Sequence, residues 1–148
     1  MTSPSFEPRV VWLPGDLRLE VHVTGEQNDG AFCMFLDYPP AGWGLPWHRH
    51  LNESETIHIL EGEFEVELER ELVQLSPGTT VHVPKGAAHR TQNVGGGPGR
   101  RVTIFSPAGA EGFFLEAGAS GPGQPVDVQA FLAIGARYGF VPVEDPES

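Results

Sequence analysis

Four side chains that commonly bind metal ions occur in the middle of this sequence at spacings that would bring them together. They are three histidines, His48, His50 and His89, and one carboxylate, Glu55. Residues two apart in a strand point to the same side, so His48 and His50 would aim both imidazoles at one point. Mixed imidazole and carboxylate sites suit iron, manganese, nickel, cobalt, copper or zinc, whereas calcium and magnesium prefer oxygen-rich shells. The pattern predicts a site for one divalent transition metal ion and does not choose among these metals.

Glu55 can join this site only if the chain turns between it and His50. It lies five residues past His50, an odd offset that would point it to the wrong side of one continuous strand. The intervening Leu51–Ser54 segment has the composition of a turn, and a turn resets the alternation. Glu55 would then begin a new strand facing inward, and Ile57 and Ile59 would share its side.

The other acidic and histidine side chains near these ligands are interpreted as surface groups. Glu53 is a rival carboxylate, but its place in the turn predicts that it is exposed to solvent. His22, His58 and His82 each alternate with apolar residues and should face outward, so they are not counted as ligands. The glutamate row between residues 61 and 71 alternates with apolar residues too, which favours a solvated strand face over a calcium site.

His89 is expected to start a returning strand. Pro84 and Gly86 predict a turn just before it, which would present its imidazole as the third nitrogen ligand. Asn93, four residues further on, is expected to hold backbone in a turn or strand and not to bind metal.

Many short strands joined by turns must position these residues. The chain has 19 glycines and 14 prolines among 148 residues, scattered between short apolar runs. A short helix should begin after the N-cap Asp127, run to about Tyr138 and be closed by Gly139. The strands expected from alternation or continuous apolar character are residues 17–23, 31–38, 61–68, 72–75 and 102–105.

The two stretches that carry the ligands resemble both conserved motifs of the cupin superfamily. Residues 42–62 have the form GxxxxxHxHxxxxExxxxxxG, and residues 78–93 have the form GxxxxxPxGxxHxxxN. All ten defining positions match. In addition, FSPAGAEGFFLEAG at residues 105–118 is similar to the region that follows the barrel in small bacterial single-domain cupins grouped with flavonol (quercetin) dioxygenases.

This resemblance implies an all-β fold, a jelly-roll barrel (double-stranded β-helix), with the short C-terminal helix packed outside. We expect one domain over residues 1–148, with the conserved barrel core at about 31–107. Small members of the family commonly pair, so we also expect a homodimer, with the strand-rich N-terminal third supplying a sheet-edge contact.

The resemblance further implies a metal-dependent enzyme, although cupins have diverse activities. We expect a dioxygenase-type oxidoreductase acting on a small organic substrate, with aromatic compounds among the candidates, and Glu55 as catalytic general base. The alternatives are a non-redox isomerase, decarboxylase or lyase, and a small-molecule-binding cupin without turnover. Trp43, Trp47, Phe113 and Phe114 would border a substrate mouth or belong to the core or a dimer contact.

Bulk properties exclude several other classes of partner. Nine basic and twenty acidic side chains give a formal net charge of −11 at pH 7, which repels nucleic acid and anionic lipid surfaces. No apolar run approaches the roughly 18 residues of a membrane span, and the N-terminus lacks the pattern of a signal peptide. The single cysteine, Cys33, lies in an apolar run and is expected in the core. We therefore expect a cytoplasmic protein without nucleic-acid or membrane partners.

Overall fold

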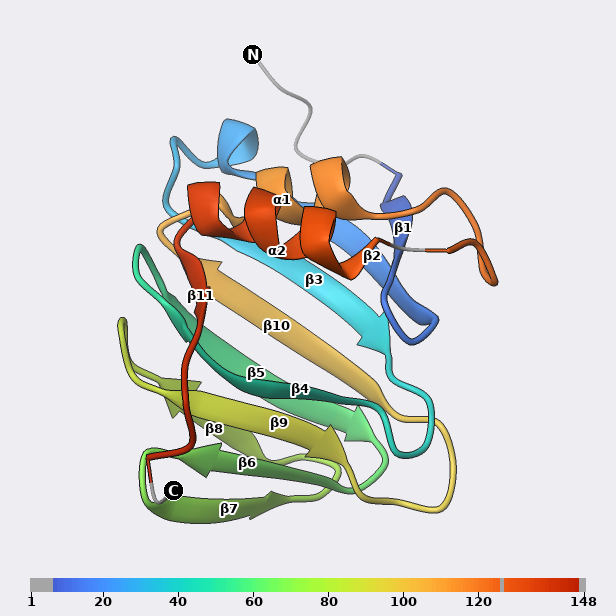
Figure 1. Ribbon diagram of the computed structural model, residues 1–148, viewed down its shortest axis with the longest axis vertical. Coiled ribbons are helices and arrows are strands. Elements are labelled where there is room, and N and C mark those ends of the chain that lie inside the picture. The colour runs from blue at the N-terminus through green and yellow to red at the C-terminus, as the bar shows by residue number, and fades with distance from the viewer. Residues whose placement is uncertain (1–6, 126, 147–148) are drawn as a thin grey trace.

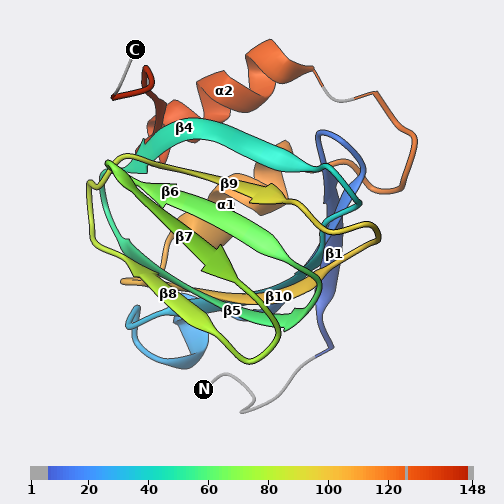
Figure 2. The ribbon, with the colours of Figure 1, turned by 90° about the horizontal axis from the view of Figure 1, so that it is seen from below.

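Two antiparallel sheets form the body of the protein in the computed structural model, which describes residues 7–125 and 127–146. They face each other across the interior, and the helices lie together at one end (Figures 1 and 2). The first sheet has the order β1-β2-β3-β10-β5-β8. Its strands are β1 (Arg9–Leu13), β2 (Leu17–Val23), β3 (Cys33–Tyr38), β10 (Arg100–Ser106), β5 (Ser54–Glu61) and β8 (Thr80–Val83).

The second sheet has the order β11-β4-β9-β6-β7. Its strands are β11 (Phe140–Pro142), β4 (Gly44–His50), β9 (His89–Asn93), β6 (Phe64–Leu68) and β7 (Glu71–Leu75). A 3-10 turn, η1 (Gly25–Gln27), follows β2, and two short helices are α1 (Ala110–Ala117) and α2 (Val128–Arg137). The prediction of a mostly β protein made of antiparallel strands is thus confirmed. No helix in the described part of the chain is long and apolar enough to cross a membrane.

One predicted strand, residues 61–68, is wrong as a single element. β5 ends at Glu61, and β6 begins at Phe64 in the opposite sheet. Gly62 between them has φ +94°, and a Cβ built on it would lie 3.0 Å from the Gly99 Cα. Alternation continues across this turn, so the pattern alone could not reveal the change of sheet. The glycine both permits the left-handed backbone and allows the close approach of a second segment.

The C-terminal helix agrees with the sequence, whereas α1 is an addition. Asp127 caps α2 through Oδ1, which accepts from the Ala130 amide, and Gly139 follows the helix with φ +82°. α1 is only eight residues long and follows Gly109 without a polar side-chain cap. The sequence therefore has no strong local capping signal for α1. The helix is stabilised by tertiary packing, in which Phe113 is buried.

The core consists of two apolar clusters, and a buried cation lies between them. The larger cluster includes Trp43 and collects side chains from β1–β3, β10, β11 and both α-helices, whereas the smaller includes Phe64 and lies among β5–β8. The Arg101 guanidinium lies 5.3 Å from the Trp43 ring centroid and 5.1 Å from that of Phe64. Cys33 is buried, as expected.

Asn93 holds three backbone segments together, which confirms its predicted role. Its Nδ2 donates to the carbonyls of Pro39, Pro40 and Gly97 at 3.0–3.1 Å. Its Oδ1 accepts from the Gly95 amide. This side chain therefore fixes the glycine-rich loop after β9 against the end of β3.

Candidate metal centre

The four predicted ligands come from three strands that belong to both sheets. His48 and His50 lie on β4, Glu55 lies on β5, and His89 is the first residue of β9. β4 and β9 pair His48 with His89 in the second sheet, whereas β5 belongs to the first. The turn after β4 therefore carries the chain across to the facing sheet and points the Glu55 carboxylate back at the imidazoles.

Donor atoms of the three histidines converge, and the Glu55 carboxylate lies beside two of them. One ring nitrogen of each histidine lies within 4.8 Å of the others in the cluster of His48, His50 and His89. Glu55 Oε1 lies 3.1 Å from His89 Nε2 and 3.6 Å from His50 Nε2. Because nitrogen and oxygen ligands lie about 2.0–2.2 Å from a transition metal, two ligands of one ion are roughly 3–4 Å apart. The donor set and its spacing fit a divalent transition metal.

The imidazoles of His48 and His89 are oriented by backbone carbonyls. Nδ1 of His48 donates to the Pro46 carbonyl at 2.7 Å, and Nδ1 of His89 donates to the Ala87 carbonyl at 3.0 Å. A proton held on Nδ1 leaves the Nε2 side of each ring directed at the cluster. Such outer hydrogen bonds fix the tautomer and orientation of metal-binding histidines.

Glu55 and His89 form an ion pair inside the site. Burial disfavours a charge on either group, but the hydrogen bond between them and the surrounding histidines dominate: the pKa of Glu55 is lowered to about 2, and the pKa of His89 is raised. His89 has an acceptor at each ring nitrogen, which fits its protonated form. By contrast, burial and the two neighbouring histidines lower the pKa of His48 to about 3, so it is neutral at physiological pH.

The expectation that Glu53 is exposed to solvent is wrong. The residue is 3% exposed, and its Oε1 lies 3.6 Å from Nδ1 of His50. Nδ1 is on the side of the ring opposite the cluster, so Glu53 supports His50 from behind and does not compete with Glu55. The turn that carries Glu53 is held by a distant segment, because the amide of Leu51 donates to the Gly139 carbonyl.

Phe140 belongs to the site although sequence reasoning omitted it. Its ring stacks on His48 with centroids 4.8 Å apart and meets His50 edge-on at 5.6 Å. β11 pairs with β4 so that Phe140 lies opposite His50. No local signal marks this residue, because it lies in a three-residue strand far from both motifs.

The remaining histidines lie outside the cluster, as predicted. His58 and His82 each hydrogen-bond to a threonine on the neighbouring strand, and His22 contacts Glu20. The inward placement of Ile57 and Ile59 beside Glu55 is also confirmed, since both isoleucines are buried.

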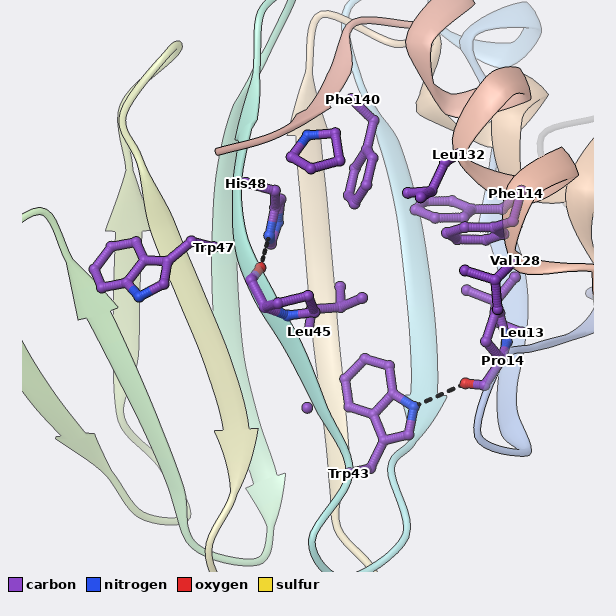
Figure 3. A pocket seen from close by; sticks show the side chains of 14 residues that line it. Leu13, Pro14, Trp43, Leu45, Trp47, His48, Phe114, Val128, Leu132 and Phe140 are labelled. Atoms are coloured by element: carbon purple, nitrogen blue, oxygen red, sulfur yellow. Dashed lines mark hydrogen bonds between the residues drawn. The ribbon is translucent and has the colours of Figure 1, made fainter. Parts of the chain in front are cut away.

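Two neighbouring cavities give access to the centre. A pocket of about 260 Å³ lies against His48, with Trp43 and Phe114 in its wall, and Figure 3 shows Trp47 pointing away from His48. A cavity of about 40 Å³ reaches Glu55. Trp43, Trp47 and Phe114 thus border a pocket, as one sequence interpretation held, whereas Phe113 is packed in the core between the helices and β11.

Comparison with known proteins finds a family that matches the segment containing this centre. Residues 34–105, which contain all four candidate ligands, match the family described as Cupin domain. The solved structure of an RmlC-like cupin from Shewanella frigidimarina NCIMB 400 superposes with a TM-score of 0.60 at 20% identity, covering 70% of this chain and 87% of that one. At that identity the likeness shows the fold alone.

Two curated relatives match over different lengths. The chain is 30% identical over 77 residues to quercetin 2,3-dioxygenase of Bacillus subtilis (strain 168), a match covering 52% of this chain and 23% of that protein. It is 29% identical over 126 residues to a protein named polyketide synthase CurC from Streptomyces cyaneus, covering 84% of this chain and 80% of that one. The match therefore spans less than a quarter of the dioxygenase.

Proposed function

Because this chain belongs to the cupin superfamily through its cupin domain at residues 34–105, we propose that it is a metal-dependent, dioxygenase-type oxidoreductase acting on a small organic substrate. One observation carries the proposal: three imidazoles from β4 and β9 cluster together, and the Glu55 carboxylate from the facing sheet lies 3.1 Å from one of them. Burying titratable groups costs free energy of folding, so a cluster of them indicates a functional site.

His48, His50 and His89 would hold the ion through neutral Nε2 atoms, and Glu55 would complete the shell. The ion would supply orientation of substrate or oxygen and stabilisation of developing negative charge. Glu55 is ionised at neutral pH because its pKa is about 2, so its carboxylate can accept the proton of a substrate hydroxyl or enol. The small cavity beside Glu55 leaves room for that proton transfer.

One of the curated relatives supports the dioxygenase type of activity, and neither identifies the substrate of this chain. One is named a quercetin dioxygenase and the other a polyketide synthase, and both names refer to compounds rich in oxygen substituents. We also infer that the two sheets close as a jelly-roll barrel, which is supported by the likeness to the RmlC-like cupin.

Metal content tests the first half of the proposal. Protein purified without added metal should contain about one transition metal ion per chain, and His48→Ala or His89→Ala should lower occupancy at least about tenfold. His58→Ala is the matched control because His58 lies on β5 and contacts Thr80 away from the cluster. Elemental analysis provides the measurement, with circular dichroism to confirm folding. Equal metal content in all four proteins would refute the site.

Oxygen uptake tests the second half. Metal-loaded protein screened against phenolic and 1,3-dicarbonyl compounds should consume oxygen with at least one of them. Glu55→Gln should retain the fold yet lower kcat about 10²–10⁴-fold if Glu55 is the base. Turnover without oxygen uptake would move the assignment to the isomerase, decarboxylase or lyase class. An unchanged kcat in a metal-loaded Glu55→Gln variant would refute the base role.

A further inference from the structure

The pocket beside His48 is lined almost entirely by apolar side chains. It lies between β4 and α2, and Figure 3 shows His48 and Phe140 on one side and Leu132 and Val128 on the other. Among the side chains that line it, His48 alone is ionisable, and the rest are aliphatic or aromatic.

Two polar side-chain atoms of this wall are already engaged in hydrogen bonds. The indole N–H of Trp43 donates to the Pro14 carbonyl at 3.1 Å, and Nδ1 of His48 donates to the Pro46 carbonyl. A polar substituent midway along a bound molecule would therefore lose its water without gaining a partner. A ligand that fits this wall carries its polar groups at one end, next to the Nε2 side of His48.

The pocket lies next to a second, smaller cavity that touches Glu55. The small cavity is lined by four of the same side chains as the pocket, and these are Leu13, Trp43, Leu45 and Phe114. The two cavities are thus neighbours on either side of a shared wall. Of the four candidate ligands, His48 alone lines the pocket, so the polar end of a molecule seated there would meet the centre at His48.

Size and ring content narrow the ligand further. A volume of about 260 Å³ is close to the lower end of small-molecule pockets, which start at roughly 300 Å³. Trp43, Phe114 and Phe140 offer ring faces and edges, and aromatic ligands gain from offset or edge contacts with such rings. The space fits one or two fused rings.

Most of the pocket wall lies outside the cupin segment at 34–105. Phe114 lies on α1, Leu132 on α2 and Phe140 on β11, all C-terminal to that segment. β11 is nevertheless joined to the metal strand, because it pairs with β4. The elements that would choose the substrate are therefore separate in sequence from those that would bind the ion.

We propose that this pocket is the substrate site and that it takes a flat aromatic compound of one or two rings whose hydroxyl or keto oxygens lie at one end. The residues from α1 to β11 select the aromatic body, and the oxygen-bearing end meets the centre at His48. This inference rests on the proposed function for the role of the bound molecule as substrate, but binding itself can be measured without turnover.

Two naphthalene probes test it by isothermal titration calorimetry. 1-Naphthol carries its single hydroxyl on one ring and should bind, whereas 2,6-dihydroxynaphthalene carries a hydroxyl at each end and should bind at least about tenfold more weakly because one of them lacks a partner. Leu132→Trp fills the pocket and should weaken 1-naphthol binding at least about tenfold. Leu72→Trp, on an exposed β7 position, is the matched control and should bind like the parent.

A second variant guards against misfolding of the first. Val128 is 54% exposed at the pocket rim, so Val128→Trp should fold and should also weaken binding. Absence of 1-naphthol binding, equal affinity for the two probes, or parental affinity in both pocket variants would overturn the proposal. Metal content separates the two ideas: if the protein binds no metal when metal is supplied but still shows pocket-dependent binding of 1-naphthol, this inference stands and the proposed enzyme is removed.

Discussion

At the scale of single residues, the three imidazoles of the centre differ in what holds them. Backbone carbonyls orient His48 and His89, and these acceptors cannot be removed by a side-chain substitution. His50 instead has the buried Glu53 carboxylate behind it. A carboxylate behind a ligating histidine fixes its tautomer and raises its basicity as a ligand. Glu53 is therefore a positioning residue that can be tested separately from the ligands.

Substitution of Glu53 should weaken metal binding without removing a ligand. Glu53→Gln keeps the volume but removes the charge behind His50, and the affinity for Co²⁺ should fall about 10–100-fold. The visible absorption of the Co²⁺-loaded protein should change as well, because His50 would be less firmly oriented. Glu71→Gln on the exposed start of β7 is the control. Parental Co²⁺ affinity and an unchanged spectrum in Glu53→Gln would exclude the positioning role.

The Glu55–His89 pair predicts a proton exchange on metal binding. The pKa of His89 is raised above 6.5 by Glu55, so at pH 6.5 more than half of the metal-free molecules hold a proton on His89 that the metal must displace. More than half a proton should therefore be released per ion, and the affinity should increase with pH until the pH exceeds the folded-state pKa of His89. Calorimetry in two buffers of different ionisation enthalpy measures this release. A binding enthalpy independent of the buffer would contradict the prediction.

The same pair makes the stability of the metal-free protein depend on pH. The raised pKa of His89 contributes stability that is present below the unfolded pKa of about 6.5 and lost as the pH rises through the folded-state value. The lowered pKa of Glu55 contributes stability that is present above 4.5 and lost as the pH falls toward 2. Metal-free protein should therefore be destabilised from both directions, and urea titrations across this range would reveal it.

At the scale of elements, a buried arginine that is paired with Asp37 in its own sheet also bonds to the facing sheet. Arg101 on β10 donates from Nε and Nη2 to both carboxylate oxygens of Asp37 on β3, at 2.9 and 2.7 Å. Its Nη1 donates to Thr91 on β9 in the other sheet at 3.1 Å. Arg101 is 5% exposed and Asp37 is 5% exposed. The hydrogen bond from Arg101 to Thr91 thus joins the two sheets beside the strands that carry the candidate metal ligands.

Removing the acidic partner of this pair should be costly. Asp37→Asn leaves a buried guanidinium without its counter-charge, and the free energy of unfolding should fall by about 3–5 kcal/mol. Glu116→Gln breaks an exposed pair with Arg137 and should cost no more than about 1 kcal/mol. Urea denaturation of both variants measures the difference. Similar losses for the two substitutions would show that the buried pair contributes no more than a surface pair.

At the scale of the whole molecule, association through a sheet edge stays a prediction. β1 is an edge of the first sheet, and its outer side meets Ala119 only at Trp12. Sedimentation should give twice the 16.0 kDa of one chain, and Val10→Pro should shift the equilibrium toward monomer because proline cannot donate to a neighbouring strand. Leu72→Pro on the β7 edge is the control. A parent protein that sediments as a monomer would exclude the dimer.

Short-range pattern was sufficient for much of the centre. The HxH pair on one strand, the turn that reverses the side on which Glu55 points and the cap at Asp127 depend on residues only a few positions apart. Asn93 also bonds to Pro39 and Pro40, which lie far back in the chain. Alternation, turn composition and capping are local properties of a chain, so they can be read before folding. The cytoplasmic location and the extent of the single domain stay predictions of the same kind.

Contacts between distant segments decided the rest. Glu53 is buried in a turn that bonds to the distant Gly139, and Phe140 reaches His48 because β11 pairs with β4. The exchange of sheets at Gly62, the helix α1 and the apolar pocket likewise depend on segments that meet only in the folded chain. The burial of a residue depends on which side chains pack over it, and these often come from distant parts of the chain. The local alternation of apolar and polar residues therefore does not predict it.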